Sequence, residues 1–147
     1  MYMVKLKIQM SKLKVLSFII MPDQKSIKIL LIEDDSFLRE LMSEKLRNAG
    51  YNVIEAADGN EGLKKIQTEN PALVLLDLIL PGIDGFDLLR AFRKELKIEV
   101  PIIVLSNLGN KDDIDRVMSA GANDYLIKAH FTPTDILERM KKYFPKP

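Results

Sequence analysis

Residues 72–82 read Ala-Leu-Val-Leu-Leu-Asp-Leu-Ile-Leu-Pro-Gly, an apolar run that delivers one carboxylate, Asp77, just before a turn at Pro81 and Gly82. A short segment that is apolar at every position is typical of a β-strand covered on both faces. Such strands belong to parallel sheets, which bind ligands at the carboxyl ends of their strands. Asp77 is therefore a candidate reactive group.

From Ile27 onward the chain alternates between strand-like and helix-like segments. Apolar runs of strand length predict strands at Ile27–Ile32, Tyr51–Glu55, Ala72–Leu76, Pro101–Leu105 and Asp124–Ile127. Helical spacing of apolar residues predicts helices at Ser36–Ala49, Asn60–Glu69, Gly85–Leu96, Lys111–Ala120 and Thr134–Tyr143. Strands that alternate with helices pair in parallel through right-handed crossovers. The sequence therefore predicts an α/β fold with a five-stranded parallel sheet between two layers of helices.

The 147 residues divide into a basic extension and one domain. Residues 1–26 hold five lysines and one aspartate, whereas residues 27–147 hold 17 basic and 20 acidic residues. We expect residues 1–26 to be poorly ordered, with an added strand over Val4–Met10 or an interfacial anchor as the alternatives. Residues 27–144 form the predicted domain, and the tail 145–147 leaves no room for an output domain.

Composition argues against several classes of function. The mildly acidic domain has no basic face for nucleic acid, so we expect no direct DNA binding. The chain has no cysteine, which excludes disulfides, thiolate nucleophiles and cysteine-ligated zinc and fits a cytoplasmic location. The apolar run Val15–Met21 is far shorter than the roughly 20 residues that span a bilayer, so we expect no stable membrane insertion.

Polar residues follow four of the predicted strands. Glu33 and Asp34 follow the first strand, Asp77 the third, Ser106 the fourth and Lys128 the fifth. If the strand order is 2-1-3-4-5, three carboxylates converge at one edge of the sheet. Two like charges at about 4 Å repel by about 4 kcal/mol at an effective dielectric of about 20, so the acids need a cation. Oxygen ligands without cysteine predict Mg²⁺.

A carboxylate, a divalent cation, a hydroxyl and an ammonium are the groups that stabilise a transferring phosphoryl group. A carboxylate can also be the nucleophile and form an aspartyl phosphate. Asp77 is the sole acid at its strand end, whereas Glu33 and Asp34 lie in an acidic cluster better suited to holding metal. We therefore predict Asp77 as the phosphoacceptor, assisted by Ser106 and Lys128.

Four motifs together resemble the receiver domain of two-component response regulators. They are Ile29–Asp35, Leu75–Gly85, Ile102–Ser106 and Gly121–Lys128, and the resemblance covers residues 27–144. It implies a flavodoxin-like fold and phosphoryl transfer from a phosphohistidine to Asp77. It also implies that Mg²⁺ is held by Glu33 or Asp34, by Asp77 and by the backbone carbonyl of Ile79.

The resemblance further implies how the domain signals. Lys128 and the Ser106 hydroxyl would contact the phosphoryl oxygens, and Tyr125 would turn inward as Ser106 moves. The signal would appear on the predicted fourth helix, fifth strand and fifth helix, through which a homodimer is also implied. The implied partners are a histidine kinase or phosphotransfer protein and a downstream protein, and the domain would be a switch and not a turnover enzyme.

Two positions depart from the family, and several readings stay open. Ala129 replaces the proline that usually follows the lysine in a cis peptide, so Lys128 would be held either by a trans loop of different shape or by a strained cis peptide. Asn107 stands where a small residue is usual. Asp35 and Ser36 can simply cap a helix, and Tyr125 can be a packed core residue. One alternative function is a pseudo-receiver that binds partners without phosphorylation. Another, an aspartate-nucleophile phosphatase, needs an acid where Ile79 stands.

Overall fold

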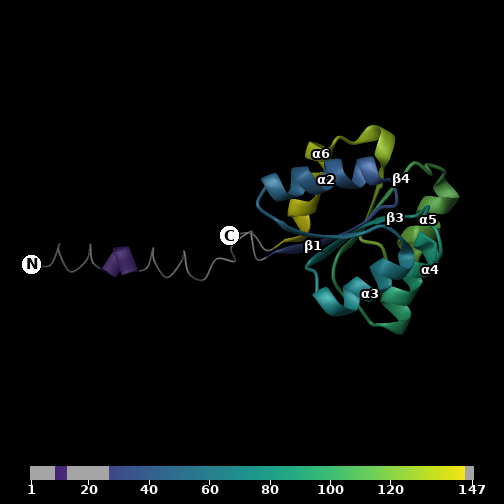
Figure 1. Cartoon of the computed structure of the whole chain (residues 1–147), viewed down its shortest axis with the longest axis horizontal. Coiled ribbons are helices and arrows are strands. Elements are labelled where there is room, and N and C mark those ends of the chain that lie inside the picture. Colours follow the sequence, from purple (N-terminus) through teal and green to yellow (C-terminus); the bar gives the residue numbers. More distant parts are fainter. Residues whose placement is uncertain (1–8, 13–26, 145–147) are drawn as a thin grey trace, which may run out of the picture.

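In the computed structural model, which describes residues 9–12 and 27–144, the domain is a three-layer sandwich built on five parallel strands (Figure 1). The strand order is β2-β1-β3-β4-β5, as the sequence predicts. The strands are β1 (Lys28–Ile32), β2 (Asn52–Ala56), β3 (Leu73–Asp77), β4 (Ile102–Ser106) and β5 (Asp124–Ile127).

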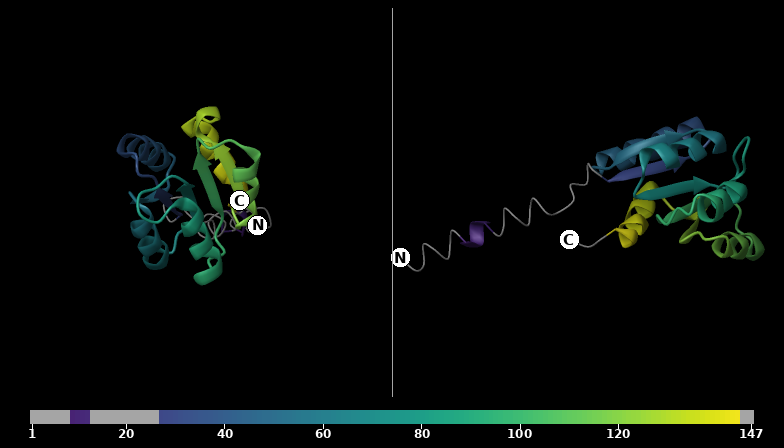
Figure 2. Two further views of the ribbon diagram at one scale, coloured as in Figure 1. Left: turned by 90° about the vertical axis from the view of Figure 1, so that its right-hand side faces the viewer. Right: turned by 90° about the horizontal axis from the view of Figure 1, so that it is seen from below.

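Helices cover both faces of the sheet. Helices α2 and α6 lie on one face, and α3, α4 and α5 lie on the other (Figures 1 and 2). The helices are α2 (Ser36–Asn48), α3 (Gly59–Glu69), α4 (Gly85–Arg90), α5 (Lys111–Ser119) and α6 (Pro133–Met140). Shorter turns are the π-helix η2 (Ala91–Glu95) and the 3₁₀ helices η3 (Lys128–His130) and η4 (Lys141–Tyr143).

Each of these five α-helices begins behind a capping side chain. The oxygen of the capping residue accepts a hydrogen bond from the backbone N–H three residues later, which satisfies one of the free donors of the first turn. The caps are Asp35, Asp58, Asp84, Asn110 and Thr132. The interpretation of Asp35 as a cap is therefore confirmed, because its Oδ1 accepts a hydrogen bond from the N–H of Leu38 at 3.0 Å. The same interpretation is wrong for Ser36, which is the first residue of α2.

The sheet separates two apolar cores. Leu30 and Leu76 face the core beneath α3, α4 and α5, whereas Leu31 and Leu75 face the core beneath α2 and α6. All four side chains are buried, as expected for central strands of a parallel sheet. A fixed register holds these strands, with Asp77 opposite Leu105 and Ser106 opposite Ile127.

Four strands differ by one residue from their predicted boundaries. β1 begins one residue later than predicted, and β2, β3 and β4 begin and end one residue later. In β3 and β4 the shift arises because the ladder includes the polar residues Asp77 and Ser106. Asp77 and Ser106 are consequently the last residues of their strands and take their positions from the sheet itself.

The predicted helix Gly85–Leu96 is also divided. It is α-helical only to Arg90 and continues as the π-helix, in which the N–H of Leu96 bonds to the carbonyl of Ala91. Periodicity alone does not distinguish a wide turn from an α-helical one. In the N-terminal extension, residues 9–12 form one exposed helical turn, against the strand alternative for Gln9 and Met10. The other predictions for the extension and the tail lie outside the described residues.

The first turns of α2 depart most from the expected packing. Phe37, Leu38 and Leu41 belong to the apolar stripe of this helix, yet Phe37 is 71% exposed and the other two are exposed as well. Only Met42 and Leu46 of the stripe are buried. Helical spacing reveals an apolar face, but it does not reveal whether another element covers it.

Candidate functional site

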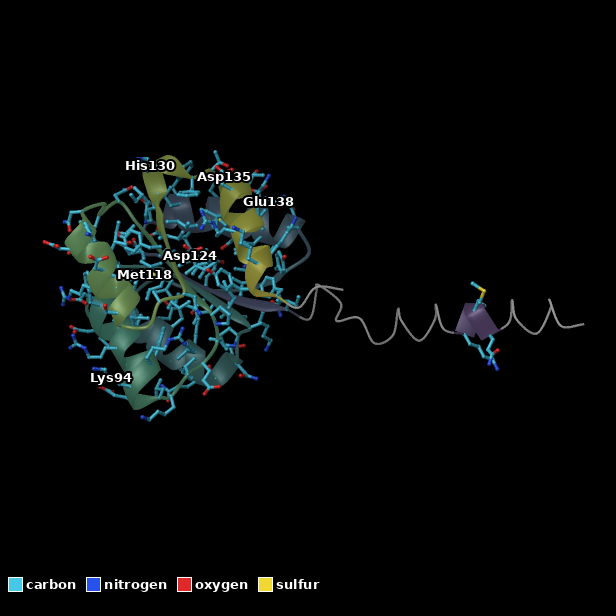
Figure 3. All side chains as sticks on the ribbon, turned by 180° about the vertical axis from the view of Figure 1, so that it is seen from behind. Lys94, Met118, Asp124, His130, Asp135 and Glu138 are labelled. Atoms are coloured by element: carbon cyan, nitrogen blue, oxygen red, sulfur yellow. The ribbon has the colours of Figure 1, made fainter. Side chains whose placement is uncertain are left out.

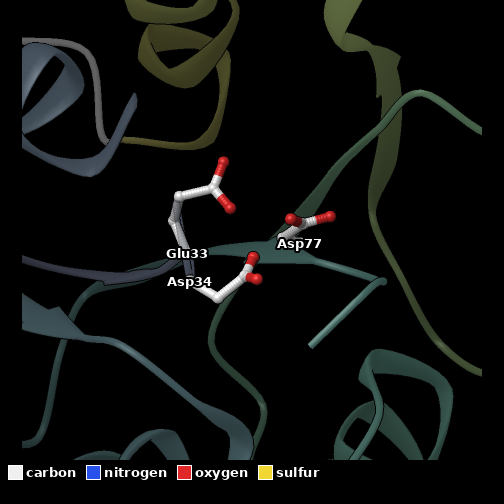
Figure 4. Close-up of side chains that lie close together, drawn as sticks. All are labelled: Glu33, Asp34 and Asp77. Carbon is white, nitrogen blue, oxygen red and sulfur yellow. The ribbon is translucent and has the colours of Figure 1, made fainter. Parts of the chain in front are cut away.

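The ends of two neighbouring strands bring the three predicted acids together. Glu33 and Asp34 directly follow β1, and Asp77 ends the neighbouring strand β3. Carboxylate oxygens of the three residues lie within 4.8 Å of one another (Figure 4). Glu33 and Asp77 are buried, whereas Asp34 is exposed, so the cluster opens to solvent on one side. The predicted convergence of carboxylates is therefore found.

Lys128 neutralises part of this charge. Its Nζ lies 2.5 Å from Glu33 Oε1 and 2.9 Å from Asp77 Oδ2. None of the described peptide bonds is cis, so a trans loop that continues into η3 carries the lysine to the acids with Ala129 in the proline position. Burial alone would lower the pKa of Lys128, but its bonds to the two carboxylates outweigh burial and raise the pKa. The ammonium is therefore charged.

Glu33 is held in an unfavourable environment for a carboxylate. Burial, followed by the nearby carboxylate of Asp77, raises its pKa to about 7, although Lys128 acts in the opposite direction. Its second oxygen, Oε2, is buried and has no hydrogen-bond partner among the described residues. A buried carboxylate oxygen without a partner is costly, and either a proton or a cation relieves that cost.

The donor set fits a hard divalent cation. It contains oxygen ligands only, one buried acid has an unused oxygen, and the exposed carboxylate of Asp34 leaves space for retained water. Mg²⁺ prefers such a set, with one or two carboxylates and several waters. Beside it, the N–H of Ile79 donates to Asp77 Oδ1 at 3.2 Å. The use of the Ile79 carbonyl as a ligand stays a prediction.

Ser106 and Tyr125 contact the same loop. Ser106 is fully buried at the end of β4, and its Oγ accepts a hydrogen bond from the N–H of Leu108 at 3.2 Å. The Tyr125 hydroxyl donates to the carbonyl oxygen of Leu108. Tyr125 also packs against the core on the α3, α4 and α5 side, so its ring is structural while its hydroxyl binds the loop. Asn107 in this loop is exposed.

An apolar pocket of about 150 Å³ opens beside the acids. Glu33, Asp77 and Lys128 line it together with apolar side chains of α2 and of the segment from η3 to α6. Leu38 and Leu41, two of the exposed residues in the apolar stripe of α2, are among its walls. Asp77, at 7% exposure, thus lies in the wall of a pocket whose other walls are largely apolar.

Arg39 binds the backbone beside the acids, a contact that the sequence did not predict. Its Nη1 donates to the backbone carbonyl of Glu33 at 2.8 Å and to that of Asp34 at 3.3 Å. Its Nε lies 3.6 Å from Glu55 Oε1 on β2. An arginine one helical turn after an acidic strand end was visible in the sequence, but its partners are carbonyl oxygens that no side-chain pattern identifies.

Comparison with known proteins agrees with this geometry. The family model of the response regulator receiver domain matches residues 29–141. The probable transcriptional regulator ycf27 of Porphyridium aerugineum is 40% identical over 114 residues, which are 78% of this chain and 46% of that protein. The alkaline phosphatase synthesis transcriptional regulatory protein PhoP of Bacillus subtilis is 37% identical over 116 residues, which are 78% of this chain and 47% of that protein.

Solved structures give the same fold. The BeF3-activated N-terminal receiver domain of Klebsiella pneumoniae RstA has a TM-score of 0.74 at 32% identity, over 79% of this chain and 97% of that one. Chemotaxis protein CheY4 of Vibrio cholerae has a TM-score of 0.74 at 29% identity, over 80% of this chain and 98% of that one. The flavodoxin-like fold implied by the sequence is thus confirmed.

These matches cover only part of each curated relative, which limits what they show about the function of this chain. The chain spans about half the length of the curated relatives it matches, and their names describe transcriptional regulators. They lend no support to the prediction that the chain does not bind DNA, which stays a prediction. Within residues 9–12 and 27–144, no helix has the length and apolar character needed to cross a bilayer. With the motifs, the sheet order, the acidic site and the family match in agreement, the chain belongs to the response regulator receiver domain family.

Proposed function

We propose that Asp77 accepts a phosphoryl group from the phosphohistidine of a histidine kinase or phosphotransfer protein. The observation that carries this proposal is the position of the Asp77 carboxylate, which shares a 4.8 Å cluster with two other acids and contacts the Lys128 ammonium at 2.9 Å. An Asp77 oxygen forms a bond to phosphorus as the phosphorus–nitrogen bond breaks, and the histidine nitrogen keeps the electron pair. The acceptor is modified once per signal and performs no turnover on an external substrate.

We propose that Glu33, Asp34, Asp77 and the Ile79 carbonyl hold the Mg²⁺ that neutralises the phosphoryl oxygens. Lys128 supplies a second positive charge, since its ammonium already lies at the acceptor carboxylate. The Ser106 hydroxyl ends the adjacent strand and can turn from the Leu108 N–H toward a phosphoryl oxygen. These roles use each polar group that the strand ends deliver.

The signal is proposed to leave through α5, β5 and α6. Ser106 leads into the loop before α5, and Lys128 follows β5 directly, so a movement of either residue displaces this surface. Figure 3 shows that side of the molecule, with Met118 on α5, Asp124 on β5 and Glu138 on α6. A phosphoryl group adds a charge of about −1.5 to −2, which is enough to bias a two-state loop. A homodimer through this surface, a downstream protein partner and a cytoplasmic location belong to the same proposal.

The test is phosphorylation of the full chain by acetyl phosphate with Mg²⁺, followed by intact-mass measurement. We expect a mass increase of one phosphoryl group in the wild type and none in Asp77→Asn. Asp87→Asn is the matched control, because Asp87 is an exposed acid on α4 whose ion pair with Arg90 lies outside the site. The double variant Glu33→Gln/Asp34→Asn should lose the dependence of labelling on Mg²⁺. Failure of the wild type to form an adduct with either acetyl phosphate or a phosphohistidine donor would leave only the pseudo-receiver.

A further inference from the structure

We infer that Arg39 is the positioning residue of the metal-binding acids, holding the backbone of Glu33 and Asp34 so that their carboxylates face Asp77. The inference rests on the proposed function, because it concerns the Mg²⁺ site of the phosphoacceptor. It assigns a role to a basic residue that lies outside the cluster of reactive groups. Arg39 contacts the acids through their main chain and makes no bond to their carboxylates among the described contacts.

The first argument is the number of restraints on this turn. The Glu33 N–H donates to the carbonyl of Ala56 at 3.0 Å, which ties the residue to β2. Arg39 Nη1 binds the carbonyls of Glu33 and Asp34 at 2.8 and 3.3 Å. Asp35 then uses its side chain to cap α2. Arg39 thus supplies the bonds to both carbonyl groups between the end of β1 and the helix cap.

The second argument is that Arg39 is itself anchored at its other edge. Its Nε lies 3.6 Å from Glu55 Oε1, and Glu55 Oε2 accepts from Arg47 at 3.1 Å. Only one fifth of the Arg39 side chain is exposed, so the guanidinium has little freedom to leave this position. A planar guanidinium that donates hydrogen bonds to the turn through Nη1 and pairs with Glu55 through Nε links the acidic turn to β2, which a flexible ammonium does less well.

The third argument is that the turn needs such support. The carboxylates of Glu33, Asp34 and Asp77 repel one another, and among the described residues the Lys128 ammonium pairs with Glu33 and Asp77 but not with Asp34. Without its carbonyl restraint the Asp34 peptide can rotate and move its exposed carboxylate away from Asp77. Removal of outer partners that orient metal ligands typically weakens metal affinity about 10–100-fold.

The test measures Mg²⁺ affinity by amide NMR titration of the full chain, comparing wild type with Arg39→Gln, Arg39→Lys and Arg47→Gln. Arg47→Gln is the matched control, since Arg47 lies on the same helix and shares Glu55 but does not contact the acidic turn. We expect affinity to fall about 10–100-fold in Arg39→Gln, to recover partly in Arg39→Lys and to stay unchanged in Arg47→Gln. Urea unfolding establishes that each variant is folded under the titration conditions.

A second readout separates positioning from general destabilisation. In acetyl phosphate labelling, Arg39→Gln should raise the Mg²⁺ concentration needed for half-maximal rate while the rate at saturating Mg²⁺ stays close to wild type. Unchanged or tighter Mg²⁺ binding in Arg39→Gln would overturn the inference. Unchanged binding would show that the turn needs no support from Arg39, and tighter binding would show that the guanidinium merely repels the cation. If the wild type itself binds no Mg²⁺, the proposed metal site fails along with the inference, and the two failures are thereby distinguished.

Discussion

Replacing Lys128 by methionine should expose the electrostatic cost of the acidic site. The substitution retains an unbranched apolar stem but removes the ammonium that lies 2.5 Å from Glu33 Oε1 and 2.9 Å from Asp77 Oδ2. Removing one partner of a buried ion pair costs about 3–5 kcal/mol, because the remaining charge is left uncompensated. Glu33 reduces that cost by taking up a proton, since its pKa already stands at about 7.

We therefore expect the free energy of unfolding to fall by about 3 kcal/mol in the absence of Mg²⁺ at neutral pH. With a slope of about 1–3 kcal/mol per molar urea, the unfolding midpoint falls by roughly 1–3 M. Mg²⁺ should reverse much of this loss, because a ligand at 100 times its Kd adds about 2.7 kcal/mol. The variant should also bind Mg²⁺ more tightly than wild type, since no ammonium competes for Glu33 and Asp77.

Urea unfolding followed by circular dichroism, with and without Mg²⁺, measures both effects. Lys141→Met is the control, because Lys141 pairs with Glu138 on the exposed face of α6 and η4, and exposed pairs contribute about 0–1 kcal/mol. Equal urea midpoints for wild type and Lys128→Met without Mg²⁺ would refute the reasoning. The ammonium would then not be the counter-ion of the acids.

Three further outcomes follow from other contacts. Ser43→Ala should raise the free energy of unfolding measured in urea melts by about 1 kcal/mol, because the buried Ser43 hydroxyl has no hydrogen-bond partner among the described residues. A lower free energy of unfolding in the variant would show that the hydroxyl does make a hydrogen bond. Gly85→Ala should destabilise the domain and slow acetyl phosphate labelling, because its Cβ would lie 2.4 Å from Leu78 Cα and 2.6 Å from the Asp77 carbonyl; unaltered melts and rates would contradict this. Mg²⁺ affinity should rise from about pH 6 to about pH 8, because the cation binds the ionised form of Glu33 and the pKa of Glu33 is raised to about 7. Calorimetric titrations that give the same affinity at each pH would contradict this.

Much of the fold could be predicted from the sequence because parallel strands have a strong local signal. β3 and β4 are apolar on both faces, and the alternation with helices requires crossovers, which together define the sheet. The last residue of each strand was harder to predict, since Asp77 and Ser106 are polar and nevertheless take part in the β-ladder. The exposure of Phe37 could not be predicted either, because an apolar stripe on a helix does not show whether another element packs against it.

The candidate site was predictable where a side chain follows directly from the sheet. Glu33 and Asp77 are fixed by neighbouring strands, so topology alone brings them together. Lys128 was less certain, because its reach depends on a loop whose shape Ala129 leaves open in the sequence. Arg39 was not identified, since its bonds go to carbonyl oxygens, which each residue in the chain offers equally.

The sheet also partitions the energetics of the domain. Leu30 and Leu31 are adjacent in sequence but belong to different cores on opposite faces. Substitutions separated by more than about 7–10 Å with no shared neighbours usually contribute additively to stability. Substitutions in different cores that meet this condition should therefore add, whereas adjacent strand residues such as Leu30 and Leu31 couple the two cores through the backbone that they share.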